Sequence, residues 1–264
     1  MTFLDWLMSS YPNPSIHGQW GLLHILTLVA CIIIIVAFTF LFRSKSEKTR
    51  RTVLWCLVAI LILFEVARRV INFIKTTDFS FQNVLHILLP RPWCAISVFL
   101  IIFAMCVNKK FMYNFVSITG LLCALAFFAY PGVGFNNQYI LFENLYSIMT
   151  HSLILICTIL LITFKFTKFE FKTMYKELVV LACVLTYVLF EIYVLGIESD
   201  PMYFMPGNDI MEILGVSYPS FIVLYILVFA LYFSSFYLIS DRKRKKNRSE
   251  DNFEQILSII KENM

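Results

Sequence analysis

Charged side chains are scarce in this sequence. Only 15% of the 264 residues are Asp, Glu, Lys or Arg, against about 25% in an average soluble domain. Hydrophobic residues make up 59%, and the mean hydropathy is +0.77. A soluble core cannot bury so large an apolar share, so the composition predicts a polytopic membrane protein. The net charge of +5 is small and gathers in alternate loops, which indicates membrane orientation and not nucleic-acid binding.

Paired cysteine motifs and an N-terminal targeting pattern are also missing. Six of the seven cysteines lie inside long apolar runs, and none has the CxxC spacing of metal or redox sites. We expect small buried cysteines, with no disulfide framework, no metal and no cofactor. The first twenty residues lack the basic segment and apolar core of a cleavable signal peptide. Cys94 is the exception among the cysteines, because it closely follows Pro90 and Pro92.

Seven apolar stretches have the length of a membrane span. A helix needs about 20 residues to cross a hydrocarbon core of about 30 Å, and an open strand would leave its backbone unpaired in lipid. The sequence therefore predicts an all-α membrane protein, a seven-transmembrane helix bundle over residues 20–240. It lies between an extracellular N-terminal segment at 1–19 and a basic cytoplasmic tail at 241–264. The expected spans are 20–42, 52–75, 85–107, 111–130, 143–164, 177–197 and 217–240.

Basic residues gather in alternate loops of this bundle. One set of loops has several basic residues, in the ranges 43–51, 109–110 and 165–176, and the run DRKRKKNR follows the last span. The opposite loops hold only Lys75 and Arg91 as basic residues, together with acidic ones. The positive-inside rule then predicts an outside N-terminus and a cytoplasmic C-terminus, in a multi-pass protein of the cell membrane. The final basic run is expected to anchor the span to anionic head groups.

Ionisable side chains within the spans share one depth. Early residues of odd-numbered spans and late residues of even-numbered spans fall in the outer half, and the inner half holds almost none. Such groups are costly in lipid and often functional, so they predict one outward-facing polar pocket. Simpler interpretations exist: Glu65 is spaced to pair with Arg68 and Arg69, and either arginine could reach the head groups. His24 could bond a backbone carbonyl, and Glu191 lies close to the interface. The group consists of His24, Glu65, Arg68, Arg69, Cys94, His151 and Glu191.

The third span is interrupted at LPRPWC. A proline disfavours the helical region for the residue before it and removes a backbone hydrogen bond, so a regular helix is expected to begin near Pro92. From there to Val107 the helix spans about 22 Å, less than a bilayer core. Cys94 would then lie below the outer interface in the first helical turn, where free N–H groups favour a thiolate. Activation would also need a base, and His151 at similar depth is the candidate.

A resemblance to a known family rests on five segments in a fixed order: QWGLLHILTL, LLPRPWCAISVFL, YNFVSITGLLCALAFFAYPGVG, LFENLYSIMTHSLIL and DPMYFMP. Over residues 20–240 the chain resembles the YwaF-like integral membrane protein family, the group of transmembrane protein 164. The resemblance implies a phospholipid acyltransferase that handles ether-linked phosphatidylethanolamine. It also implies Cys94 as the catalytic residue, His151 as its partner and His24 as the first-span histidine. The residues RPW before the cysteine depart from the polar residue that the family commonly has there.

Three functions stay open on this sequence. In an enzyme, Cys94 would attack a phospholipid ester and pass the acyl group to a lysophospholipid or to water, with His151 as general base and then acid. Arg69 or His24 would bind the phosphate or orient the acceptor, and Glu65 would line the pocket. A transporter or receptor would bind a small or lipidic ligand in the same pocket without a covalent step. The third is a structural membrane protein. Membrane phospholipids are the expected partners.

Overall fold

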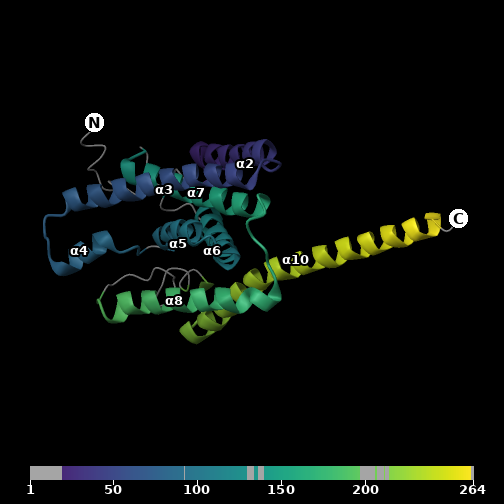
Figure 1. Ribbon diagram of the computed structural model, residues 1–264. Coiled ribbons are helices and arrows are strands. Elements are labelled where there is room, and N and C mark those ends of the chain that lie inside the picture. Colours follow the sequence, from purple (N-terminus) through teal and green to yellow (C-terminus); the bar gives the residue numbers. More distant parts are fainter. Residues whose placement is uncertain are drawn as a thin grey trace.

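The computed structural model describes residues 20–91, 93–129, 134–135, 140–196, 206, 211 and 214–262, with side chains up to residue 245. The segment 1–19 and most of DPMYFMP lie outside these ranges. Within them the chain is helical and forms no strand (Figure 1). This confirms the predicted all-α class. The elements are α2 (Leu22–Phe42), α3 (Glu47–Lys75), α4 (Phe81–Leu88), α5 (Trp93–Val107), α6 (Lys110–Ala129), α7 (Phe142–Thr163), the 3₁₀ turn η2 (Phe171–Thr173), α8 (Met174–Tyr193) and α10 (Tyr218–Glu262).

The length and composition of the helices are those of a multi-pass membrane protein. Within the described ranges, five segments are long and apolar enough to cross a bilayer: α2, α6, α7, α8 with its preceding turn, and α10. The bent pair of α4 and α5 makes a sixth candidate when it is counted as one span. α3 has 29 residues, but its apolar stretch contains Glu65, Arg68 and Arg69. The count of seven spans depends on α3 and stays a prediction. The orientation of the two termini also stays a prediction.

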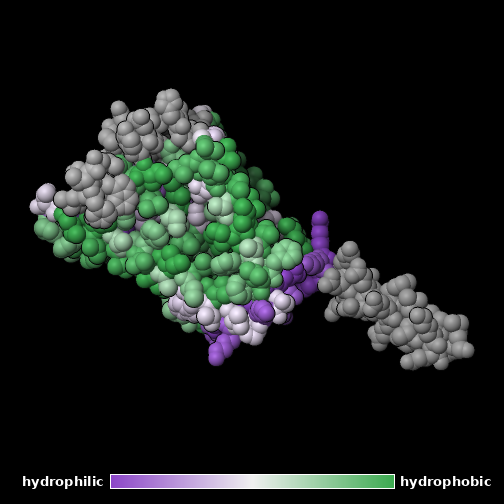
Figure 2. Space-filling view, turned by 90° about the horizontal axis from the view of Figure 1, so that it is seen from above, coloured by the Kyte–Doolittle hydropathy of each residue, from purple (hydrophilic) through white to green (hydrophobic). Residues whose placement is uncertain are grey.

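α6 and α7 form the centre of the bundle. Both are buried along most of their length, whereas α2, α8 and α10 leave most of theirs exposed. A Cβ atom at Gly120 would lie 2.7 Å from Thr158 Cγ2, so the glycine allows α6 to approach α7 closely. Apolar residues cover most of the face seen in Figure 2, as expected for helices that contact lipid.

The segments that the sequence places on one side meet at one end of the bundle. Arg50 of α3 donates to the backbone oxygen of Phe164 after α7. The Asn114 side chain of α6 exchanges two hydrogen bonds with the backbone of Lys168, at 2.9 and 2.8 Å. Arg244 of α10 donates to a backbone oxygen in the same loop at 2.8 Å. This end of the bundle is called the basic end below.

The last helix is longer than the predicted span. α10 runs without a break over 45 residues, where the sequence predicted a span at 217–240 and then a separate tail. Lysine, arginine and glutamate are good helix formers, so the basic run prolongs the helix. Figure 1 shows the yellow end of α10 projecting beyond the other helices. In Figure 2, hydrophilic residues surround the root of this projection.

The third span breaks where its prolines predict. α4 ends at Leu88, α5 begins at Trp93, and the two helices are bent by 57°. Leu89, which precedes Pro90, has a ψ of 143°, the extended value that a following proline imposes. The expected helix start near Pro92 is confirmed, although Pro92 itself lies outside the described residues.

A short helix precedes the break, and the apolar pattern did not predict it. The N–H of Asn83 donates to Oγ of Ser80 at 3.3 Å, which caps the start of α4. The Asn83 amide also donates to the side chain of Asp78 at 3.1 Å. These polar groups fix the turn between α3 and α4.

Candidate functional site

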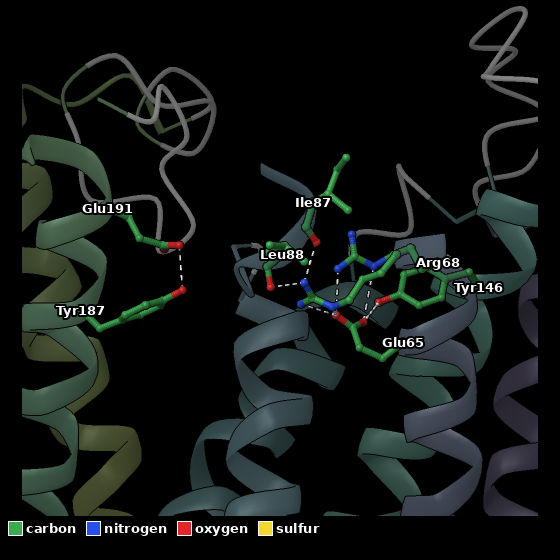
Figure 3. A network of polar contacts seen from close by, with 8 residues as sticks. Glu65, Arg68, Ile87, Leu88, Tyr146, Tyr187 and Glu191 are labelled. Carbon is green, nitrogen blue, oxygen red and sulfur yellow. Dashed lines mark hydrogen bonds and ion pairs between the residues drawn. The ribbon is translucent and has the colours of Figure 1, made fainter. Parts of the chain in front are cut away.

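A buried carboxylate organises the polar side chains away from the basic end. Glu65 in α3 is 4% exposed. Its Oε1 lies 2.8 Å from Nη2 of Arg68 and of Arg69, as their spacing predicted. The hydroxyl of Tyr146 in α7 donates to Oε2 at 2.6 Å (Figure 3). These four residues are called the Glu65 cluster. Because two guanidinium groups face one carboxylate, the cluster has a surplus of positive charge.

Arg69 also ties α3 to the broken span. Its Nη1 donates to the carbonyl of Ile87 at 2.5 Å and to the carbonyl of Leu88. These carbonyls belong to the last turn of α4, where no N–H of the same helix is available to donate to them. The guanidinium also lies 5.1 Å from the ring centre of Phe99 in α5. Arg69 therefore holds the two halves of the broken span, and its role in binding substrate stays a prediction.

Cys94 lies beside this cluster in the first turn of α5. Its side chain is half-buried, and the backbone N–H groups of Cys94 and Ala95 act on its sulfur. The thiol also lies within electrostatic range of Arg68, Glu65 and Tyr146. A helix N-terminus and a neighbouring cation are the surroundings in which reactive cysteines occur.

His151 in α7 is held in one orientation. Its Nδ1–H donates to the backbone oxygen of Ser147 at 2.7 Å, which leaves Nε2 of the neutral ring as an acceptor. The ring stacks on Phe127 of α6, with centroids 3.8 Å apart. Among the described residues, no hydrogen bond or charge interaction joins His151 to Cys94. The pairing of these two residues stays a prediction.

His24 lies among aromatic rings that lead to His151. The side chain is fully buried in the described structure, and its ring centre is 4.8 Å from that of Phe135. Phe135 in turn lies 5.8 Å from Phe127, the ring that stacks on His151. The two histidines are thus linked through phenylalanine rings, away from the ion pairs of the Glu65 cluster.

Two buried groups that the sequence assigned to a loop and to the interface lie near the broken span. Arg91 is 6% exposed and Glu191 is 1% exposed. Arg91 Nη1 lies 2.8 Å from Nε2 of His86, and the hydroxyl of Tyr187 donates to Glu191 at 2.7 Å. Figure 3 shows the Tyr187–Glu191 pair on α8, apart from the Glu65 cluster. Their burial depends on how α8 packs, which the order of residues does not reveal.

A second buried carboxylate lies at the basic end. Glu177 of α8 is fully buried. The Asn114 amide donates to its Oε1 at 2.8 Å, and the hydroxyl of Tyr237 in α10 donates to its Oε2. These three residues are called the Glu177 cluster. The expectation of almost no ionisable group in the inner half overlooked Glu177, because it stands at the first position of its predicted span.

The arrangement near Cys94 offers two chemical elements: a thiol at a helix start and a surplus of positive charge. The described part of the chain contains no set of three His, Cys, Asp or Glu side chains arranged to hold a metal ion.

A comparison with models of protein families gave a match over most of the chain. The family model described as "TMEM164 family" matches residues 19–239, which include every candidate site residue named above. The searches of curated proteins and of solved structures found no significant match.

Proposed function

This chain belongs to the TMEM164 family, and from that premise we propose that it is a membrane-embedded phospholipid acyltransferase or acyl hydrolase that uses Cys94 and His151. The observation that carries the proposal is the position of Cys94 at a break in a span, in the first turn of α5 and beside Arg68. Irregular backbone at membrane depth is tolerated where it lines a cavity. A reactive thiol at such a break can meet the ester groups of a lipid.

The proposal includes the membrane topology. In this topology α3 is the second of seven spans, and its half-buried arginines are neutralised in part by Glu65. The N-terminus faces outside and the basic end faces the cytoplasm of the cell membrane, as the positive-inside rule requires. The Glu65 cluster then lies in the outer half of the bilayer.

The reaction begins with proton transfer from the Cys94 thiol to Nε2 of His151. The sulfur attacks the ester carbonyl carbon, and N–H groups at the start of α5 stabilise the oxyanion. When the C–O bond breaks, His151 returns the proton to the departing alkoxide, so a lysophospholipid leaves and an acyl thioester remains. An acceptor hydroxyl or water then attacks the thioester, and His151 takes the proton of that nucleophile. The C–S bond breaks, and His151 returns the proton to the Cys94 sulfur, which restores the thiol.

The test uses the full chain in nanodiscs that contain a diacyl phospholipid with an isotope-labelled acyl chain. The native protein is expected to move the label to added lysophospholipid or to release it as fatty acid. Cys94→Ser should lose most of this activity, since serine is a much weaker nucleophile without a stronger base. His151→Ala should lose nearly as much, because residues that act as a unit are not additive.

The matched control is Cys106→Ser, which changes an exposed cysteine on the same helix. It should keep native activity and a native acyl adduct in intact mass spectrometry. Equal label transfer by the native protein and Cys94→Ser would exclude the cysteine mechanism.

A second function, a transporter or receptor, is favoured by the bent pair of α4 and α5 beside buried charges, since broken helices line the binding sites of many transporters. This second function is favoured if Cys94→Ser and His151→Ala both leave the phospholipid profile unchanged while a ligand still binds to the outer pocket.

A further inference from the structure

A cavity lies at the corner between α3 and α4. Its volume is about 500 Å³, and it is shallow and largely open. The lining includes Asn72, Lys75, Thr76, Asn83, His86 and Ile87. The corner follows directly on the apolar part of α3, so it lies at the end of the bundle away from the basic end. Most of these side chains can donate hydrogen bonds.

A buried guanidinium stands behind the cavity wall. Arg91 is 6% exposed, and its Nη1–H donates to Nε2 of His86. Among the described residues, Nε and Nη2 of Arg91 have no hydrogen-bond partner. Glu191 attracts Arg91 from a distance, but it accepts its hydrogen bond from Tyr187. Buried donors without acceptors are costly, and the positive charge of Arg91 behind His86 attracts an anion bound at His86.

His86 lines the cavity and contacts the buried Arg91. Because its Nε2 accepts from Arg91, a neutral ring bears its proton on Nδ1 and offers a second donor. Lys75 lies on the same lining, 3.0 Å from Oε1 of Glu143, and its ammonium has three N–H donors in total. The lining also contains one carboxylate, that of Asp78, which accepts from Asn83 and from the N–H of Ser80.

We infer that this corner is a phosphate-binding site whose donors are Lys75 and His86, with the guanidinium of Arg91 behind His86. A phosphate group has several acceptor oxygens and a negative charge, which match the ammonium of Lys75 and the Nδ1–H of His86 on the cavity lining. The volume exceeds what a small ion needs and accommodates a larger phosphoester group. Two sources share this chemistry, a lipid head group and free phosphate.

The cavity is connected to the Glu65 cluster through its wall. Ile87 lines the cavity, and its carbonyl accepts from Arg69, which pairs with Glu65. A phospholipid held here by its phosphate would present its ester groups towards α5. This last step rests on the proposed function, whereas phosphate binding itself does not require Cys94.

The experiment is native mass spectrometry of the full chain in detergent with three probes: dioleoyl phosphatidylglycerol, inorganic phosphate and dioleoylglycerol. The native protein is expected to retain the phospholipid in preference to dioleoylglycerol. The double variant Lys75→Gln with His86→Gln should weaken phospholipid binding about tenfold or more, as expected when charge-assisted hydrogen bonds are removed. Competition by inorganic phosphate would identify free phosphate as a second ligand of the same site, and its absence would assign the site to the lipid.

Two variants keep the result interpretable. His86→Gln alone changes an exposed side chain, so a folded protein is expected, and its binding should also fall. Lys172→Gln removes a 79% exposed positive charge at the basic end and should leave binding unchanged. Native affinity in both cavity variants overturns the inference.

The outcome is independent of catalysis. Cys94→Ala should bind the phospholipid as the native protein does, even though it cannot form an acyl thioester. If the cavity variants bind the phospholipid normally while Cys94→Ser transfers no label, the phosphate-site inference is wrong and the cysteine mechanism is supported. If the cavity variants lose phospholipid binding and neither the native protein nor any variant transfers the label, the phosphate site is supported and the proposed enzymatic function is wrong.

Discussion

Glu65 and Glu177 are both buried glutamates in apolar helices, yet different partners offset the cost of burying their carboxyl groups. Glu65 faces two arginines and one tyrosine hydroxyl. Glu177 accepts from the Asn114 amide and the Tyr237 hydroxyl. Among the described residues, no ion pair reaches Glu177, although lysines abound at that end.

The difference separates two tasks. The Glu65 cluster holds more positive than negative charge next to a broken span, so it remains attractive to an anion. The Glu177 cluster joins α6, α8 and α10 through neutral donors, and its acceptors are satisfied within the protein. The surplus positive charge of the Glu65 cluster indicates a role in binding an anion. The Glu177 cluster has all its acceptors satisfied by neutral donors, which indicates a structural role in holding the helices together.

The largest effect is expected for Glu65→Gln. The change leaves two arginines in a buried environment without their carboxylate, and removal of one partner from a buried ion network costs about 3–5 kcal/mol. Unfolding in detergent should report a corresponding loss of stability. A loss below that of the Glu177 variants would show that the arginines reach water or lipid head groups.

Tyr146→Phe should have the next largest effect. It removes the hydrogen bond of 2.6 Å to Glu65 and retains the ring, and a hydrogen bond to a charged group contributes about 1.5–3 kcal/mol. The measurement is the same unfolding experiment. As a matched control, Phe127 has no hydroxyl to lose, so Phe127→Leu should change packing without altering the response to Glu65→Gln in a double-mutant cycle.

Glu177→Gln should cost less, about 1 kcal/mol. The amide oxygen can still accept from one donor, and the Tyr237 hydroxyl can turn to accept from the new amide. Stability in detergent again provides the measurement. A cost equal to that of Glu65→Gln would contradict the comparison, because it would mean that Glu177 is charged and paired with a cation.

The smallest effect is expected at Glu170, a carboxylate outside the spans. The nearby ammonium of Lys168, 2.8 Å away, holds the pKa of Glu170 below its ordinary value of 4.5, and Lys172 and Arg244 add to this. Its contribution to holding Arg244 is therefore fully present above pH 4.5 and is lost as the pH falls through the lowered pKa. Hydrogen exchange at 241–245, compared with Glu170→Gln at each pH, measures it. Salt should weaken the effect, since exposed pairs are screened.

The sequence predicted those features that depend on neighbours along the chain. The prolines predicted the start of α5, and the spacing of Glu65 to its arginines predicted their ion pairs. The bond from Tyr146 to Glu65 joins residues 81 positions apart, and no periodic pattern encodes that contact. The length of α10 was missed because a basic run that stops insertion into lipid does not stop a helix.

Other features depend on packing alone. Arg91 lies in a short break between two helices, which normally means exposure to water, yet it is buried, within electrostatic range of Glu191 and Tyr187 on α8. Glu177 stood at a predicted boundary and is buried because Tyr237 of α10 packs over it. Such burial is decided by which helices are neighbours, and one sequence does not specify that.

The bond from Arg69 to the last turn of α4 has a consequence for biogenesis. Arg69 precedes Ile87 by eighteen residues, so the donor leaves the ribosome before the carbonyls that need it. A span with free carbonyls partitions poorly into lipid alone. The bent pair of α4 and α5 therefore depends on α3 during insertion, and we expect α3 and this pair to enter the bilayer together.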